Sequence, residues 1–230
     1  MKFNPALLSG KLKKRYKRFF TDIVIGNKTY VAHCPNSGSM MGLLQEKNGC
    51  WISKVNDPKR KLKYTLQIIE VNKNLVGVNT HLTNKIFLEA LEKNKITQFR
   101  DISEIKPEFK FNENTRFDFM LINKKQKCMV EIKNVTLKRN NNIAEFPDAV
   151  TSRGKKHLRE LINAQKQGYK SYLFFIVQRE DCDLFKIAED LDKEYFAEFN
   201  HAIKNGLNVH VYKCKITSNE IRVDKEIELT

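Results

Sequence analysis

The spacing of apolar residues changes near residue 82, and this change divides the chain into two regions that must fold differently. Before it, apolar and polar residues alternate in short runs separated by turn-forming residues, as they do in β-strands. After it, segment 83–96 repeats apolar residues at the three- and four-residue spacing of a helix. A chain of 230 residues can bury one large core or two smaller ones. We therefore predict two domains, over residues 1–81 and 82–230.

The N-terminal region predicts a small closed β-barrel. It contains five strand-like runs and no convincing helix, at residues 18–25, 28–34, 50–55, 64–71 and 75–80. The Gly26-Asn27 pair predicts a hairpin between the first two runs, and segment 34–42 is too rich in Pro, Gly, Ser and Asn for regular structure. The OB-fold is a small barrel of this kind that binds nucleic acids, so we predict an OB-like N-terminal domain.

The charge distribution indicates an anionic partner for the N-terminal region. The chain carries a net charge of +15, and residues 1–80 hold 15 Lys and Arg against 4 Asp and Glu, a net charge of +11. Solubility does not require this concentration, whereas binding to the phosphates of a nucleic acid does. The candidate contacts are Lys13, Lys14, Arg15, Arg18, Arg60 and Lys61. Aromatic residues lie among them, and we expect one or two to be exposed for stacking on bases: Tyr16, Phe19, Phe20, Tyr30, Trp51 and Tyr64.

Neither a membrane nor an oxidising compartment is indicated. No apolar run approaches the roughly 18 residues that a membrane helix requires. The apolar run at the N-terminus is too short for a signal peptide. Five cysteines are scattered without a C-x-x-C pair, which favours reduced thiols over disulfides or a zinc site. We expect a cytoplasmic protein. If its partner is DNA, it would be associated with the nucleoid.

The C-terminal region predicts an α/β domain, because helical and strand-like segments alternate. A polar connection follows the first helix to about residue 112, and segment 169–179 is the most apolar strand, expected at the centre of a sheet. The predicted elements are helices at 83–96, 146–168 and 192–205, and strands at 115–123, 128–140, 169–179, 207–217 and 220–229.

The strand at 128–140 places Glu131 and Lys133 on one face, two positions apart. The pattern alone is weak, since E-x-K triplets also occur at 104–106 and 108–110, but those lie in the polar connection. The partner strand carries Asp118 between two phenylalanines, and Glu89 lies on the preceding helix. Three carboxylates that converge require a divalent cation, and oxygen ligands suit Mg²⁺ or Mn²⁺. The alternative is a set of surface charges that never meet.

Several long motifs carry a resemblance to a known family. They are HCPNSGSMMG, VGVNT with NKIFLEAL, TRFDFML, VEIKNVTL and FPDAVTSRGKKHLREL, and the similarity runs from residue 12 over nearly the whole chain. Together they resemble the sugar fermentation stimulation protein family, SfsA. The resemblance implies an OB-like domain followed by a domain of the PD-(D/E)xK nuclease fold. It also implies a DNA-binding protein linked to the control of sugar utilisation, with DNA more expected than RNA.

The resemblance also implies roles for individual residues. Asp118 takes the D position of the nuclease motif, and Glu131 and Lys133 take the E-x-K positions. Glu89 takes the acidic position on the first helix of the fold, and Gln178 follows the central strand where relatives of this fold carry a glutamine near the site.

The mechanism expected from these residues is metal-dependent phosphodiester hydrolysis. Asp118, Glu131 and the carbonyl of Ile132 would bind Mg²⁺ with help from Glu89, and Lys133 would orient or deprotonate the attacking water or stabilise the developing charge. Near the start of the helix at 146–168, Thr151 and Arg153 are candidate phosphate contacts, and His157 is either a site residue or a satisfied buried histidine.

Two other function classes remain open. One is a non-catalytic DNA-binding regulator of sugar (maltose) metabolism that keeps the nuclease fold as a scaffold. The other is an enzyme that acts on sugars directly, which only the family name suggests; a lysine beside the carboxylates in so basic a protein favours phosphate chemistry.

Overall fold

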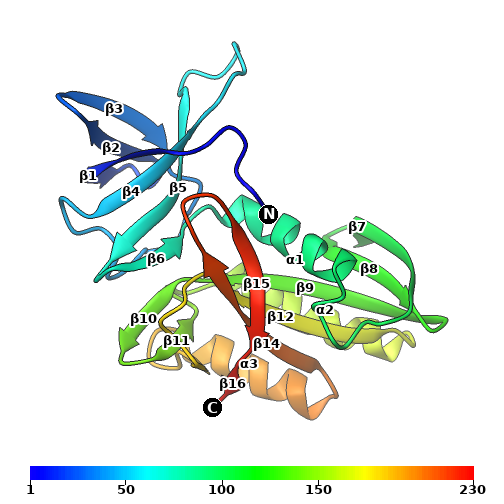
Figure 1. The fold of residues 1–230 in the computed structure, drawn as a ribbon. Coiled ribbons are helices and arrows are strands. Elements are labelled where there is room, and N and C mark those ends of the chain that lie inside the picture. The colour runs from blue at the N-terminus through cyan, green and yellow to red at the C-terminus, as the bar shows by residue number, and fades with distance from the viewer.

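The computed structural model describes residues 1–230, and its N-terminal domain is a β-barrel that lies beside a larger α/β domain (Figure 1). The strands of the first sheet run in the order β3-β2-β1-β4-β5-β6, and β3 also pairs with β5, which closes the barrel. The core of the barrel includes Leu12, Ile23 and Leu66. The bounds are β1 (Leu8–Tyr16), β2 (Phe20–Ile25), β3 (Lys28–His33), β4 (Gly49–Lys54), β5 (Tyr64–Val71) and β6 (Asn74–Gly77).

Strand β1 is the one element of the barrel that the sequence does not predict. It lies between β2 and β4 in the sheet, but Leu12 is its only buried residue. Its remaining side chains are polar or exposed, so the strand lacks the apolar alternation by which the others are found. Backbone pairing to two neighbours holds it in place. The hairpin of β2 and β3 around Gly26 is confirmed.

A mixed six-stranded sheet forms the centre of the α/β domain, in the order β15-β14-β12-β9-β8-β7. Strand β12 lies in the interior of this sheet, between β9 and β14, as its apolar sequence predicts. A four-stranded sheet, β10-β11-β13-β16, packs beside it. The large sheet consists of β7 (Ile102–Asn112), β8 (Thr115–Asn123), β9 (Gln126–Val135), β12 (Lys170–Val177), β14 (Asn208–Ile216) and β15 (Ile221–Glu226). The small one consists of β10 (Leu137–Asn140), β11 (Ile143–Phe146), β13 (Leu184–Ile187) and β16 (Glu228–Leu229).

Helices cover both faces of the large sheet, so the α/β domain has a core on each face. Phe87 of α1 packs with Phe119 and Phe174 on one face, and Leu158 of α2 packs with Phe175 and Phe199 on the other. The helices are α1 (Thr83–Glu92), α2 (Ser152–Lys166) and α3 (Lys193–Lys204), and the short 3-10 helix η1 (Thr80–Leu82) precedes α1. None of these helices has the length and apolar character needed to cross a membrane.

Further segments differ from the sequence-based expectation. Helix α1 ends at Glu92 rather than near residue 96, and the strand predicted at 128–140 divides into β9 and β10. The polar connection before residue 112 is strand β7, an edge strand with one partner, so most of its side chains can be polar. Helix α2 begins at Ser152 rather than near residue 146, because Phe146 belongs to β11 and Pro147 follows it. Thr151 caps the helix by accepting a hydrogen bond from the Gly154 N–H.

The two domains are joined by more than the linker. The N–H of Gly77 in β6 donates to the carbonyl of Gln178, which follows β12. The side chain of Gln178 is fully buried and donates to Asn134 and to Thr83. A Cβ on Gly77 would lie 2.3 Å from the Gln178 Oε1, so the close approach of the two domains here requires glycine.

Candidate functional site

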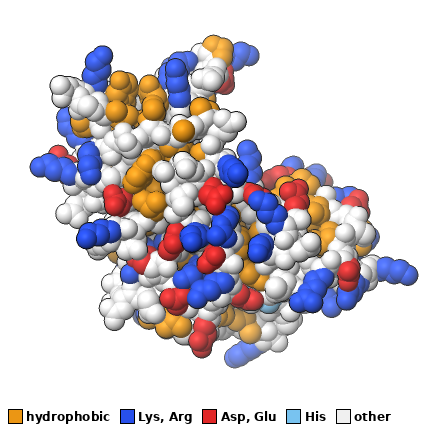
Figure 2. All heavy atoms as spheres, in the orientation of Figure 1, with side chains coloured by type: hydrophobic (Ala, Val, Ile, Leu, Met, Phe, Trp, Pro, Cys, Tyr) orange, Lys and Arg blue, Asp and Glu red, His pale blue; other side chains and the backbone are white.

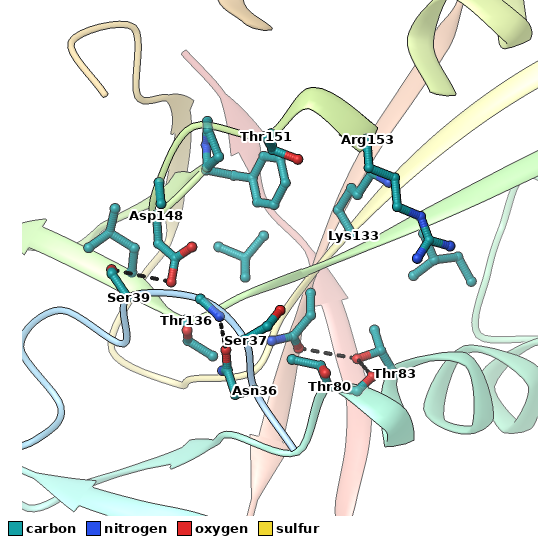
Figure 3. A pocket seen from close by; sticks show the side chains of 18 of the residues that line it. Asn36, Ser37, Ser39, Thr80, Thr83, Lys133, Thr136, Asp148, Thr151 and Arg153 are labelled. Carbon is teal, nitrogen blue, oxygen red and sulfur yellow. Dashed lines mark hydrogen bonds between the residues drawn. The ribbon is translucent and has the colours of Figure 1, made fainter. Parts of the chain in front are cut away.

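A cleft of about 920 Å³ lies between the barrel and the α/β domain. The barrel supplies the loop at residues 36–39, and the α/β domain supplies the ends of β8 and β9, the start of α1 and the segment that leads into α2. Figure 3 shows Asn36, Ser37 and Ser39 on one side of this cleft, with Lys133, Thr151 and Arg153 on another. Most of its lining residues are polar or charged, which suits a charged ligand.

Strand β9 brings Glu131 and Lys133 into this cleft. β9 pairs with β12 in parallel, where Glu131 lies opposite Leu173 and Lys133 opposite Phe175. The Lys133 Nζ lies 2.5 Å from the Glu131 Oε1. Glu131 is 3% exposed, so its neighbours rather than solvent stabilise its charge. The two-residue spacing therefore forms a buried ion pair on one face of the strand.

Strand β8 positions Asp118 beside this pair. The pairing of β8 with β9 stops at Phe119 and Val130, so the strands separate where Asp118 lies. The Asp118 Oδ2 accepts a hydrogen bond of 2.7 Å from the Ile132 N–H, and the Oδ1 accepts one of 2.8 Å from the Asn84 Nδ2. The carboxylate thus replaces a strand partner for Ile132 and is held from two directions.

The two carboxyl groups have opposite pKa shifts. Burial and the charge of Glu131 raise the pKa of Asp118 to about 6, against the hydrogen bonds from Asn84 and Ile132 and the charge of Lys133. Burial also raises the pKa of Glu131, but Lys133 and His157 outweigh it and hold the pKa below its usual value. Such a pair combines a carboxylate whose charged form is favoured with one that ionises near neutrality.

His157 from α2 completes the surroundings of Glu131. Its Nδ1 contacts the Glu131 Oε1, the same oxygen that Lys133 contacts. The other oxygen, Glu131 Oε2, is buried and has no hydrogen-bond partner. A buried carboxylate oxygen without a partner is costly, and a bound cation would satisfy it.

Glu89 does not join this cluster. It lies five residues beyond Asn84 on α1, on a different side of the helix, where it forms ion pairs with the Met1 amino group and with Lys93. No group of three or more Asp, Glu, His or Cys residues is arranged to hold a metal ion. The expected convergence of three carboxylates is therefore absent, and Asn84 takes the position on α1 that faces Asp118.

The remaining donors fit a hard divalent cation. The site offers two carboxylates and a main-chain carbonyl, and one of the carboxylate oxygens, Glu131 Oε2, has no partner. Mg²⁺ and Mn²⁺ take oxygen ligands of this kind, and Mg²⁺ usually keeps several waters or substrate phosphate oxygens as well. Residues in the positions to hold such an ion are Asp118, Glu131 and Ile132, all of which line the cleft.

Gln178 and Arg15 lie where the sequence does not lead one to expect them. Gln178 does not line the cleft, but it donates to two residues that do, to Asn134 at 2.5 Å and to Thr83 at 3.2 Å. Arg15 lines the cleft, but its guanidinium donates to the carbonyls of Asn36, Gly38 and Ser39 at 2.7, 3.1 and 3.3 Å. It holds a loop in place, and these bonds leave it less free for phosphate contacts.

The other predicted cationic residues are distributed over both domains. Lys13, Lys14 and Lys61 are exposed on the barrel, and Figure 2 shows Lys and Arg side chains spread over this area of the surface. Arg18 and Arg153 are exposed and line the cleft with Thr151. The Thr151 hydroxyl caps the helix and the Thr151 N–H donates to the Asp192 Oδ2 at 2.8 Å, so Thr151 mainly positions the start of α2.

Sequence reasoning missed the loop that closes the cleft from the barrel side. The Asp148 Oδ2 accepts hydrogen bonds from the Met40 N–H at 3.2 Å and the Ser39 hydroxyl at 3.4 Å (Figure 3). A Cβ on Gly38 would lie 2.3 Å from the same oxygen. The density of Pro, Gly, Ser and Asn predicted an irregular loop, but no local signal shows which distant carboxylate it meets.

Fold and site together define a two-domain protein: an OB-type barrel joined to a mixed α/β domain whose interior strand presents a buried carboxylate–lysine pair to the interdomain cleft. The family model of the SfsA N-terminal OB domain matches residues 14–78, and that of the sugar fermentation stimulation protein RE domain matches residues 81–220. The chain belongs to the sugar fermentation stimulation protein family, SfsA.

Individual relatives agree over the full length. A sugar fermentation stimulation protein homolog from Pelagibacter ubique is 57% identical over 229 residues, covering 100% of this chain and 99% of the relative. One from Nitrosococcus oceani is 40% identical over 235 residues, with the same coverage. A solved structure, described as Pyrococcus furiosus SfsA in complex with Ca²⁺, superposes with a TM-score of 0.91 at 23% identity, covering 100% of this chain and 98% of that one. This last likeness shows the shared fold.

Proposed function

We propose that this protein is a nuclease that hydrolyses phosphodiester bonds of DNA with Mg²⁺ or Mn²⁺ held between Asp118 and Glu131. The observation that carries the proposal is the Glu131 carboxylate, which is 3% exposed and keeps one oxygen without a partner, beside a second carboxylate in a cleft rimmed by Arg18 and Arg153. Two carboxylates side by side with little access to water repel each other, and a cation bound between them would relieve this cost. When bound, such an ion polarises a phosphate oxygen and lowers the pKa of a bound water.

The residues around the ion would have separate roles. Asn84 and the Ile132 N–H hold Asp118 in a fixed orientation, and His157 does the same for Glu131. Lys133 is fixed by its 2.5 Å contact with Glu131 and presents its remaining protons to the cleft. There it would orient the attacking water or donate to the phosphate oxygens as negative charge develops.

The rim of the cleft supports binding of the phosphates on either side of the scissile bond. Arg153 is exposed at the start of α2, where backbone N–H groups favour an anion. Arg18 approaches from the barrel. A nucleic-acid strand held between Arg18 and Arg153 would pass the Asp118–Glu131 pair.

The descriptions of two similar proteins agree with this proposal. The solved Pyrococcus furiosus structure is described as a complex with Ca²⁺, an ion that takes the same oxygen ligands as Mg²⁺. The family model over residues 81–220 is described as an RE domain. As part of this proposal, we extend the divalent-cation site and the nuclease-like character of the domain to this chain.

The test is cleavage of labelled single- and double-stranded DNA and RNA with Mg²⁺ or Mn²⁺. Glu131→Gln and Lys133→Ala should each lower the rate at least 100-fold at matched binding. The chain offers a matched control, because Glu104 and Lys106 form a second E-x-K pair, 3.0 Å apart and exposed on β7. Glu104→Gln and Lys106→Ala should cleave at the wild-type rate.

The result also decides between the proposal and its alternative. No divalent-dependent cleavage of any of these substrates by the wild type, with DNA binding intact, would overturn the proposal. It would favour a non-catalytic DNA-binding regulator that keeps the fold as a scaffold. Cleavage that survives in both Glu131→Gln and Lys133→Ala would place the active site elsewhere.

A further inference from the structure

A second recess of about 380 Å³ lies on the barrel next to the cleft, where β3 meets β5. Its lining includes His33, Arg60, Thr65, Gln67, Asn79 and His81. His81 lines both the recess and the cleft, so the two are continuous at this residue. We propose that this recess binds an unpaired nucleobase of a single strand that passes through the cleft; this rests on the proposed nuclease function.

Flat rings form one side of the recess. The His33 and His81 rings lie 6.4 Å apart, and the Phe19 ring stacks on His33 at the same centroid distance. Phe19 is 45% exposed and is the only one of the six predicted stacking aromatics that is exposed. Burial and the charges of Arg60 and His81 lower the pKa of His33, which favours its uncharged ring near neutral pH. Histidine and phenylalanine rings are surfaces on which unpaired bases stack.

Polar groups form the floor of the recess. Asn79 donates to Gln67, and Gln67 donates to Ser53, both at 2.8 Å, so the two amides are held in fixed orientations. The hydroxyl of Thr65, a residue that is 7% exposed, has no hydrogen-bond partner. Oriented amides and a free hydroxyl are the groups that recognise the edge of a base. Arg60 at the same recess would meet a phosphate.

The position of His81 relates the recess to the reacting phosphate. His81 precedes Asn84, the partner of Asp118, by three residues within η1 and the start of α1. Because His81 also lines the cleft that holds Asp118 and Glu131, a base in the recess would belong to a nucleotide near the scissile bond.

This geometry selects the class of substrate. A base whose edge faces Gln67 and Asn79 and whose ring lies against histidines has no room for a paired partner, so the strand must be unpaired near the cut.

The test is fluorescence-anisotropy binding of a labelled 12-nucleotide single strand and of the same sequence as a blunt duplex, in EDTA so that cleavage cannot interfere. His81→Ala should weaken single-strand binding about 5- to 100-fold, whereas His81→Phe, which keeps a ring, should stay within about threefold of wild type. His201, an exposed histidine on α3, provides the matched control, and His201→Ala should bind as the wild type does. His81 is exposed, so its replacement leaves the core intact; Arg60→Ala tests the same recess independently.

The outcomes separate this inference from the proposed function. Wild-type single-strand affinity in both His81→Ala and Arg60→Ala, or blunt duplex bound as tightly as the single strand, would overturn the base site even if cleavage is observed. A ring-dependent loss in His81→Ala without any cleavage by the wild type would sustain the base site and remove the nuclease. If maltoheptaose displaces the oligonucleotide from the wild type but binds more weakly to His81→Ala, the recess is a site for an oligosaccharide, and the base site is overturned.

Discussion

Replacing Asp118 with asparagine should stabilise the protein in the absence of metal while it abolishes cleavage. The pKa of Asp118 is raised to about 6 from an ordinary value of 3.8, so the folded protein favours the protonated form. A raised pKa in the folded state gives stability that is complete below 3.8 and is lost as the pH rises through 6. At neutral pH the ionised carboxylate therefore destabilises the fold.

The magnitude follows from the two pKa values. At 1.36 kcal/mol per pKa unit, ionisation of Asp118 costs about 3 kcal/mol at pH 8, about 1.6 kcal/mol at pH 5 and close to zero at pH 3. Asparagine avoids this cost and keeps the local bonds. Its oxygen can accept from the Ile132 N–H, and its amide can donate to the Asn84 side chain once that amide rotates.

The assay is thermal and urea unfolding of wild type and Asp118→Asn in EDTA at pH 8, 5 and 3. At pH 8 the variant should melt about 6 to 12 °C higher, and the difference should shrink as the pH falls. Asp101→Asn is the matched control, because Asp101 pairs with Lys124 at an exposed site and should change stability by less than about 0.5 kcal/mol. An Asp118→Asn variant no more stable than wild type at pH 8 would refute the reasoning.

The cleft supports two further predictions, and the exposed surface of the barrel supports a third. Divalent-ion binding should weaken about tenfold between pH 7.5 and pH 5, because Asp118 must lose a proton with a pKa of about 6 to act as a ligand; calorimetric titration with Ca²⁺ or Mg²⁺ measures this. Gly38→Ala should lower the free energy of unfolding by about 1 to 2 kcal/mol, because its Cβ would lie 2.3 Å from the Asp148 Oδ2 and break the hydrogen bonds of Asp148 with Met40 and Ser39. Urea unfolding measures this loss, and adding Asp148→Ala to the Gly38→Ala variant should relieve some of it. The triple replacement of Lys13, Lys14 and Arg18 by Ala should reduce the salt slope of DNA binding by about 2 to 3, because all three side chains are exposed.

Each of these has a result that contradicts it. Equal affinity for the ion at both pH values would show that Asp118 is not a ligand. Strictly additive losses in Gly38→Ala and Asp148→Ala would show that the two residues do not meet across the cleft. An unchanged salt slope in the triple variant would show that the barrel is not part of the DNA-binding surface. Arg15 is left out of that variant because it holds the loop at 36–39, so Arg15→Ala should lower stability.

Local patterns predicted much of this protein. Alternation and helical spacing located β2 to β5, α1, β8, β9, β12 and α3. Each of these elements buries one or both of its faces, so the order of apolar residues in its own segment shows its period. The two-residue spacing of Glu131 and Lys133 on an apolar strand indicated a pair on one face, and the pair is present. The long motifs indicated the SfsA family, which the family models confirm.

Elements held mainly by their neighbours escaped prediction. β1 has one buried side chain and β7 lies at a sheet edge, so neither needs an apolar pattern. The short strands of the small sheet are only two to four residues long, which is too few to show a period.

The sequence by itself therefore determined the two domains, the family and the central carboxylate–lysine pair, since these depend on residues close together in the chain. Only the tertiary structure decided that Asn84 rather than Glu89 faces Asp118, that Arg15 holds the loop at 36–39 against Asp148, and that His81 joins the cleft to a second recess. The physical reason is that these contacts join segments from different elements. Their geometry follows from how the barrel packs on the sheet, and no local periodicity records that packing.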